Sequence, residues 1–147
     1  GEANWELIRE VKNNPRMKIP VFGNGDVTCP KTAKEKKEQY NVDGIMIGRA
    51  AIGNPWLFQT IKEYLKSGKV IQEPQMTDKI EMVLNHLKWS IDWKGEKLGV
   101  LEMRRHYSNY FKDLPKIKHY RSELVQLNEY SEVVKKIHEI KSIYNNY

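Results

Sequence analysis

The pattern of apolar and polar residues changes near residue 74 of this 147-residue chain. Before that point, apolar runs at residues 18–22 and 42–47 each lead into glycine, a polar residue and a helical pattern. This order is typical of consecutive strand–loop–helix units in a parallel sheet. After it, apolar residues recur at three- and four-residue spacing, as at Ile80, Val83 and Leu87, and this predicts amphipathic helices.

These patterns predict two domains of different class. We expect residues 1–73 to be α/β and residues 77–147 to be a small antiparallel helical bundle, with a linker around Glu73–Gln75. The expected helices cover residues 4–13, 30–40 and 55–66, a segment beginning at Thr77, residues 96–112, residues 116–121 with a helical continuation to 127, and residues 131–144. Two parallel strands cannot complete a sheet, and the chain starts without methionine, so we expect it to be part of a longer protein.

Composition excludes several classes of protein but says little about function. Charged residues make up 30% of the chain, the mean hydropathy is -0.71, and no apolar run approaches the length of a membrane span. These features favour a cytoplasmic protein that does not enter a membrane. Cys29 is the only cysteine, which excludes a disulfide framework and a thiolate metal cluster. The four histidines fall in separate predicted helices, so we expect no metal site.

Two glycine-containing loops are the strongest candidates for a binding site. Asn24, Gly25 and Asp26 follow the first apolar run, and Gly48 and Arg49 follow the second. In parallel sheets ligands bind at the carboxyl ends of strands, glycine lets backbone N–H groups approach an anion, and arginine suits phosphate. We therefore predict a phosphate site at these loops. The alternative is a β-hairpin turn at Asn24–Gly25, although residues 27–30 do not continue as an alternating strand.

A second candidate is the basic middle of the helical domain. The chain carries a net charge of +6, and eight basic residues against three acidic ones lie between Lys94 and Arg121, interleaved with tyrosines and histidines. Cations that pair with phosphates and rings that stack on bases suit contacts with RNA. A solvated basic face is the alternative, because Tyr107 and Tyr110 fall on the apolar side of their predicted helix and fit a core.

Four segments of the first domain resemble the C-terminal third of the barrel in bacterial tRNA-dihydrouridine synthases. They are Gly1-Glu-Ala-Asn-Trp5, Ile19-Pro-Val-Phe-Gly-Asn-Gly-Asp26, Asp43-Gly-Ile-Met-Ile-Gly-Arg-Ala50 and Gly53-Asn-Pro-Trp-Leu-Phe58. In the second domain, Met103-Arg-Arg-His-Tyr107 and Arg121 are similar to the family's helical domain. The resemblance covers nearly the whole chain. Other FMN barrels share the Gly-Arg loop but rarely the Gly-Asn-Pro-Trp continuation.

The resemblance implies a fold class of α/β plus all-α, the C-terminal portion of a (β/α)₈ TIM barrel followed by a small helical bundle. It also implies a flavoenzyme that uses FMN, with NADPH or NADH as reductant, to reduce uridine in tRNA to 5,6-dihydrouridine. The positions that correspond to the family's FMN contacts are Asn24, Gly25, Asp26, Gly48 and Arg49, the last two at the phosphate. The likeliest positions for tRNA binding are Arg104, Arg105 and Arg121.

The family's catalytic segments have no counterpart in this chain. Its catalytic cysteine belongs to an earlier Asn-x-Gly-Cys-Pro segment, and Cys29–Pro30 follows the wrong strand to take that role. We therefore expect no catalytic residue here and no activity from this chain alone. We also expect the incomplete barrel part to self-associate through exposed apolar strand faces.

Two other functions fit the same residues. One is another FMN-dependent TIM-barrel oxidoreductase that acts on a small molecule, with the helical part as a structural cap. The other is an RNA-binding helical module that carries remnants of a barrel. Binding of tRNA with strong salt dependence would favour the synthase over the small-molecule enzyme.

Overall fold

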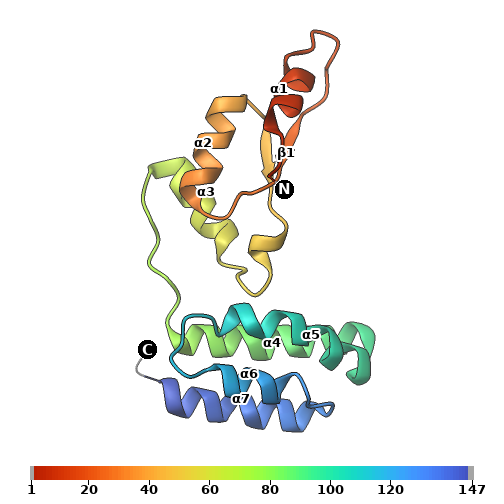
Figure 1. Cartoon of the computed structure of the whole chain (residues 1–147), viewed down its shortest axis with the longest axis vertical. Coiled ribbons are helices and arrows are strands. Elements are labelled where there is room, and N and C mark those ends of the chain that lie inside the picture. The colour runs from red at the N-terminus through yellow and green to blue at the C-terminus, as the bar shows by residue number, and fades with distance from the viewer. Residues whose placement is uncertain (1, 146–147) are drawn as a thin grey trace. The chain divides into compact units, whose positions relative to one another are not determined.

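The chain folds as two units, Gly1–Gln72 and Glu73–Tyr147, and the computed structural model describes residues 2–145 (Figure 1). Residues 68–75 contain neither helix nor strand and connect the two units. Each unit has a core of its own, so each is described by itself.

The first unit alternates strands and helices. Its elements in chain order are α1 (Trp5–Asn13), β1 (Phe22–Asn24), α2 (Pro30–Tyr40), β2 (Gly44–Met46), the 3₁₀ turn η1 (Arg49–Ala51) and α3 (Leu57–Ser67). The two strands pair in parallel, with Phe22 opposite Gly44 and Asn24 opposite Met46. Parallel pairing through the α2 crossover confirms the strand–loop–helix interpretation and rules out a hairpin at Asn24–Gly25.

The first strand lies later in the chain than its apolar run predicts. A buried strand over residues 18–22 is wrong, because β1 begins at Phe22, and the side chains of Ile19 and Phe22 are 70% and 62% exposed. A strand of a parallel sheet is buried when neighbouring strands and helices cover it, whereas β1 pairs with β2 alone. Val21, just before β1, is held by Asp43, whose carboxylate accepts from the Val21 N–H at 2.7 Å.

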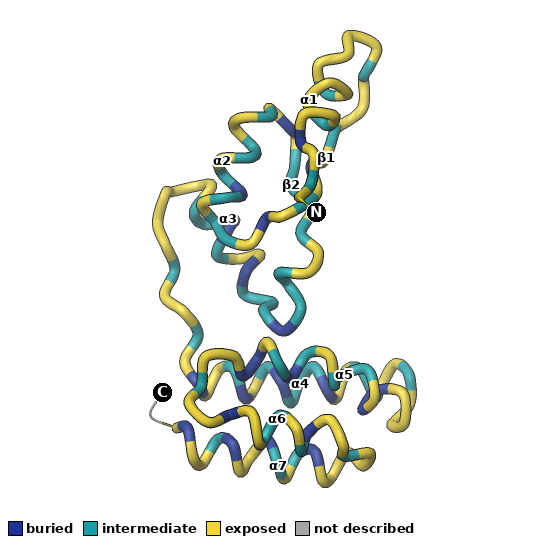
Figure 2. The backbone as a smooth tube through the Cα atoms, viewed as in Figure 1, coloured by how far each residue is buried: buried dark blue, intermediate teal, exposed yellow. Residues whose placement is uncertain are grey.

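Trp5 stands at the centre of the core of the first unit. Its ring is 2% exposed and lies 5.4 Å from the ring of Tyr40, and the ammonium of Lys36 sits 4.7 Å from the Trp5 ring centre. The other buried residues of this core are Val27, Ala33, Val42, Leu57 and Ile61. Helices α1, α2 and α3 therefore each contribute buried residues to this core. Figure 2 colours the buried residues dark blue along the backbone.

Asp43 ties the start of β2 to α1 as well as to residues 18–21. Its carboxylate accepts from the Lys12 ammonium at 2.7 Å, and its N–H donates to the Val21 carbonyl at 2.9 Å. The Lys12 hydrogen bond, and after it the Val21 N–H, hold the pKa of Asp43 below its usual value. Because the Lys12–Asp43 ion pair is exposed, it adds little to the free energy of unfolding. Its main effect is to fix the position of the chain before β1.

The second unit consists of helices packed around one apolar core. They are α4 (Met76–Lys94), α5 (Glu96–Tyr110), α6 (Lys118–Leu124) and α7 (Tyr130–Tyr144). Helices α4 and α5 form a hairpin about Gly95, and α6 and α7 pack against them (Figure 1). The fully buried side chains are Ile80, Val83, Leu87, Val100, Met103, Tyr107, Phe111, Leu124, Val133, Ile137 and Ile140. Their spacing is the one that the sequence predicts for helices.

Helix ends in the second unit differ from the predicted ones by a few residues. The α4 helix begins one residue before Thr77, where Gln75 and Asp78 form a capping box. The predicted helix over residues 96–112 ends at Tyr110, and the one over 116–121 covers Lys118–Leu124 instead. Asp113 and Lys116 have positive φ angles of 67° and 57°, so the loop between these helices turns sharply without glycine. None of the helices in the described part of the chain is both long and apolar enough to cross a membrane.

Candidate functional site

The two glycine-containing loops meet at the carboxyl ends of the paired strands. Gly25 follows β1 directly, and Gly48 comes two residues after the last residue of β2. Between them lies a hollow of about 500 Å³. Its lining residues are Asn24, Gly25, Asp26, Val27, Thr28, Met46, Gly48, Arg49 and Ala50. All five residues that the sequence predicts at a cofactor phosphate therefore line one hollow.

The first loop is held rigidly by the start of the chain. Gly25 has a φ angle of 121°, a conformation that side chains rarely adopt, and its carbonyl accepts from the indole N–H of Trp5 at 3.0 Å. Asp26 has a φ of 53°, and its carboxylate accepts from the Ala3 N–H at 2.6 Å. The loop thus has its shape before any ligand binds.

The second loop supplies an open surface and a cation. A Cβ added to Gly48 would meet no atom within 4 Å, so this residue leaves free space beside the loop. The Arg49 side chain is 89% exposed, and its guanidinium lies 3.4 Å from the Asp26 carboxylate. An ion pair that long and that exposed is weak, so the guanidinium can turn to another anion.

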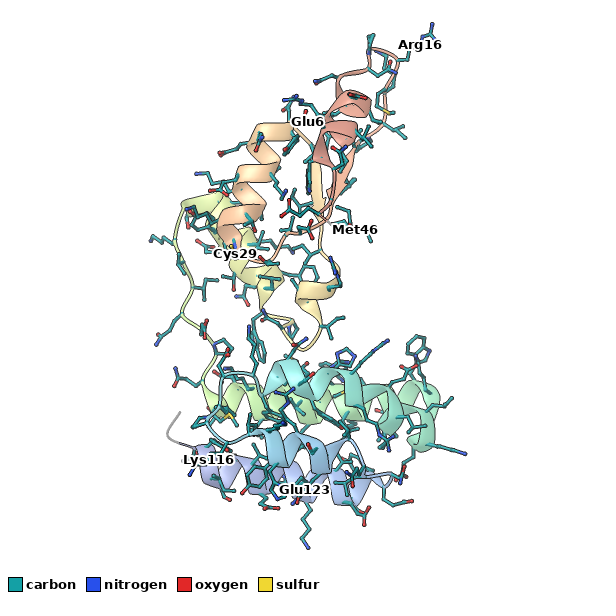
Figure 3. The ribbon with its side chains drawn as sticks, viewed as in Figure 1. Glu6, Arg16, Cys29, Met46, Lys116 and Glu123 are labelled. Atoms are coloured by element: carbon teal, nitrogen blue, oxygen red, sulfur yellow. The ribbon has the colours of Figure 1, made fainter. Side chains whose placement is uncertain are left out.

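This arrangement suits a phosphate group. N–H groups at the start of a helical turn lack acceptors within that turn, and the start of η1 follows Gly48 directly. Arg49 adds a forked donor of permanent positive charge. The Asp26 carboxylate beside it would repel a dianion on its own, but it already accepts from Ala3 and faces Arg49. The remaining lining offers the apolar side chains of Val27 and Met46, the latter labelled at the end of β2 in Figure 3.

Cys29 lies next to this hollow in sequence but is not among the residues that line it. It is the N-cap residue of α2, and its partly buried thiol lies 3.5 Å from the Thr32 hydroxyl. The hydrogen bond between that hydroxyl and the thiol is the main cause of the lowered pKa of Cys29. The thiol has a structural place at the helix start, and among the described residues no histidine contacts it.

The three arginines predicted to contact RNA do not form one cluster. Arg104 on α5 points to the loop before α7, where its guanidinium donates to the Leu127 carbonyl at 3.0 Å and to the Asn128 side chain at 2.9 Å. Arg105, the next residue, is exposed. Arg121 lies on α6 and is half-buried. Of these three arginines, only Arg104 therefore links two separate parts of the helical unit.

A pair of histidines on α4 and α5 is a feature that sequence spacing missed. The rings of His86 and His106 lie 4.6 Å apart, and the Nδ1 atom of His86 is 3.0 Å from the Tyr110 hydroxyl. Burial, and after it the charges of His86 and Arg105, lower the pKa of His106 to about 4. The sequence did contain a signal for this contact, because the two histidines lie at similar distances before and after Gly95, where the α4–α5 hairpin turns. Within the described residues no three potential metal ligands come together.

Comparisons with known proteins identify relatives along the whole chain. A family model described as "Dihydrouridine synthase (Dus)" matches residues 1–145. The "Probable tRNA-dihydrouridine synthase" of Rickettsia conorii is 38% identical over 139 residues, which is 95% of this chain and 41% of the relative. The "tRNA-dihydrouridine synthase B" of Pseudomonas putida is 36% identical over 129 residues, 88% of this chain and 38% of the relative. The chain thus spans about two-fifths of the length of these curated relatives.

Proposed function

Because the chain belongs to the dihydrouridine synthase family, we propose that it supplies the FMN-phosphate site and the tRNA-binding helices of an enzyme that reduces uridine in tRNA to 5,6-dihydrouridine. In this proposal the first unit is the C-terminal portion of a TIM barrel, with β1 and β2 as its last two strands. The relatives' names support tRNA as the substrate over a small molecule. A substrate of that kind would place the protein in the cytoplasm.

One observation carries the cofactor part of the proposal. Gly25 and Arg49 come from different loops, twenty-four residues apart in sequence, yet both line the hollow at the carboxyl ends of two parallel strands. In barrels of this type a phosphate group often binds at the loops after the last two strands. The empty space at Gly48 supports the same assignment, because no neighbouring atom of the protein requires a glycine there.

FMN, when bound, would supply the electrons that reduce the C5–C6 bond of uracil, after it has itself been reduced by NADPH or NADH. The residues of this chain have a binding role in that reaction. Arg49 and the N–H groups after Gly48 would hold the phosphate, and the rigid loop Asn24–Asp26 would position the cofactor beside it. No residue of this chain is proposed as a catalytic acid or base, so the chain alone should not catalyse the reaction.

The helical unit would hold the tRNA while the target base leaves its stack to reach the flavin. Its excess of basic residues between Lys94 and Arg121 supports this role. Arg105 and Arg121 are proposed to contact tRNA directly. Arg104 is proposed to act through the loop that it holds, because its guanidinium already donates to Leu127 and Asn128.

A comparison of FMN with riboflavin tests the cofactor proposal, since the two differ only in the phosphate. We expect FMN to perturb the backbone amide signals of Gly25 and Gly48 in NMR spectra of the 147-residue chain, and riboflavin to bind at least about 10-fold more weakly. The Arg49→Gln variant should lose most of this preference for FMN over riboflavin, while its NMR spectrum remains that of a folded protein. Equal binding of FMN and riboflavin would contradict the assignment of the hollow to phosphate.

A further inference from the structure

The start of the chain lies against the end of β1 and the loop that follows it. Ala3 and Trp5, the latter the first residue of α1, both form hydrogen bonds to that loop. A Cβ added at Gly23 would overlap the ring of Trp5. One added at Gly25 would overlap the Cβ of Ala3. The two glycines therefore let residues 3–5 lie directly on the backbone at this end of the strand.

The Trp5 ring is enclosed by several elements of the first unit. It is buried, it packs on the backbone of Gly23, and its neighbours on α2 are the ring of Tyr40 and the ammonium of Lys36. A side chain that is packed by several elements keeps one rotamer. The direction of the indole N–H is therefore fixed, and this N–H donates to the Gly25 carbonyl at 3.0 Å.

The acceptor of this hydrogen bond belongs to the residue of the loop that has the most conformational freedom. Glycine adopts several backbone conformations at little cost, so a loop with glycine at its centre does not keep one shape by itself. A fixed donor on the Gly25 carbonyl holds the planar peptide between Gly25 and Asp26 in one orientation. Both of these residues line the hollow at the strand ends. The indole of Trp5 therefore acts on the shape of the hollow although Trp5 does not line it.

Ala3 forms the second connection between the start of the chain and the hollow. Its N–H donates to the Oδ2 atom of Asp26 at 2.6 Å, and the Oδ1 atom of the same carboxylate lies 3.4 Å from the guanidinium of Arg49. Residues 3–5 are thus connected through Asp26 to the second loop as well. A displacement of Trp5 would change the first loop directly and the position of Arg49 through Asp26.

We propose that Trp5 is a positioning residue for the cofactor phosphate, because its hydrogen bond to Gly25 holds residues 24–26 in the shape that the phosphate group requires. Trp5 itself would not touch the cofactor. The choice of FMN as the ligand rests on the proposed function. A loop that already has its bound shape loses less conformational entropy when the ligand binds. The hydrogen bond would therefore contribute to the affinity for phosphate as well as to the stability of the core.

A purely structural role for the same hydrogen bond predicts a different result. A buried indole N–H usually has an acceptor, whatever the function of the protein. Removal of a purely structural bond would lower stability and leave the ratio of the affinities for FMN and riboflavin unchanged. Removal of a positioning bond would weaken FMN binding more than riboflavin binding, because only FMN carries the phosphate.

Replacement of the Trp5 indole by benzothiophene tests the hydrogen bond, because the two ring systems have nearly the same shape but benzothiophene has no N–H. A synthetic peptide of residues 1–28, ligated to a chain that begins at Cys29, introduces benzothienylalanine at position 5 alone. The chain ligated in the same way with tryptophan at position 5 is the matched control. Trp5→Phe repeats the test without synthesis, although the smaller ring leaves a cavity in the core.

We expect the benzothienyl variant to bind FMN about 5-fold more weakly than the control and to bind riboflavin about equally well. Without ligand, the NMR order parameters of the Gly25 and Asp26 amides should decrease from about 0.85 in the control toward about 0.6 in the variant. Order parameters that stay the same, or an unchanged ratio of FMN to riboflavin affinity, would overturn the proposal.

The control chain separates this inference from the proposed function. If the control prefers FMN to riboflavin and the variant keeps that preference, only the role of Trp5 is overturned. If the control binds FMN no better than riboflavin, the assignment of the hollow to phosphate fails, and the positioning role of Trp5 fails with it. A preference that is present in the control and reduced in the variant would support both.

Discussion

Gly25 and Gly48 each lie within two residues of the end of one of two neighbouring strands, but a side chain would meet a neighbouring residue only at the first. Gly25 has a φ angle of 121°, and a Cβ there would overlap with the Cβ of Ala3. A Cβ added at Gly48 would meet no atom within 4 Å. Because no neighbouring atom excludes a side chain at Gly48, its glycine leaves room for a ligand to approach the chain closely.

The two alanine substitutions should therefore affect different properties, Gly25→Ala the stability of the first unit and Gly48→Ala the binding of FMN. Gly25→Ala should lower the free energy of unfolding of the first unit by about 1–3 kcal/mol, because it forces alanine into a strained backbone conformation. Gly48→Ala should lower that free energy less than Gly25→Ala does, because its Cβ would meet no neighbouring atom, but it should weaken FMN binding. Urea denaturation followed by tryptophan fluorescence, together with FMN titration, measures both effects. If Gly48→Ala destabilised the unit as much as Gly25→Ala, its glycine would have a structural explanation instead.

The elements show why helices were easier to predict than strands. Amphipathic helices such as α4 and α7 bury one face against the rest of their own unit, so the spacing of apolar residues alone predicts them. The strands are three residues long and have one neighbour each, so their apolar runs gave no reliable start or end. The site loops were predictable because glycine and arginine are local signals.

Arg104 and Arg105 are adjacent in sequence but have different structural roles. Arg104 connects α5 to the loop before α7 through the Leu127 carbonyl, so it stabilises the arrangement of these elements. Arg105 is exposed, and its guanidinium donates to the ring of the neighbouring His106. Sequence resemblance gave both the same function, because it cannot show which direction a side chain takes from a helix.

Substitution of these two arginines should separate stability from RNA binding. Arg104→Gln should lower the free energy of unfolding of the helical unit by about 1–3 kcal/mol, since it removes two hydrogen bonds from a charged donor. Arg105→Gln should change that free energy by less than about 0.5 kcal/mol and still weaken tRNA binding. Circular dichroism during urea denaturation, and tRNA titration at two salt concentrations, provide the measurements. Equal stability of the two variants would show that the contact to Leu127 does not hold the loop.

At the scale of the whole molecule, the two units differ in the size of the apolar core that they bury. The helical unit buries side chains from all of its helices, although Trp93 is 80% exposed. The first unit buries a smaller set around Trp5 and leaves Ile19, Phe22 and Met46 at least 60% exposed. Exposed apolar strand residues are the surface that further strands and helices of a barrel would cover. Self-association of the chain through these residues remains a prediction. The same difference in burial implies that the first unit is the less stable of the two.

Ligands should therefore stabilise the two units separately. We expect two unfolding transitions, the earlier one belonging to residues 1–72, because each unit has its own core. A ligand that binds only the folded state adds about 2.7 kcal/mol at a concentration 100 times its dissociation constant, so FMN should raise only the earlier transition and tRNA only the later one. Hydrogen exchange measured by mass spectrometry can assign each transition to its residues. Arg49→Gln should abolish the FMN effect alone, and Arg121→Gln should reduce the tRNA effect alone. If one ligand protected both units, the cofactor and tRNA sites would be coupled, and the division of roles between the two units would be wrong.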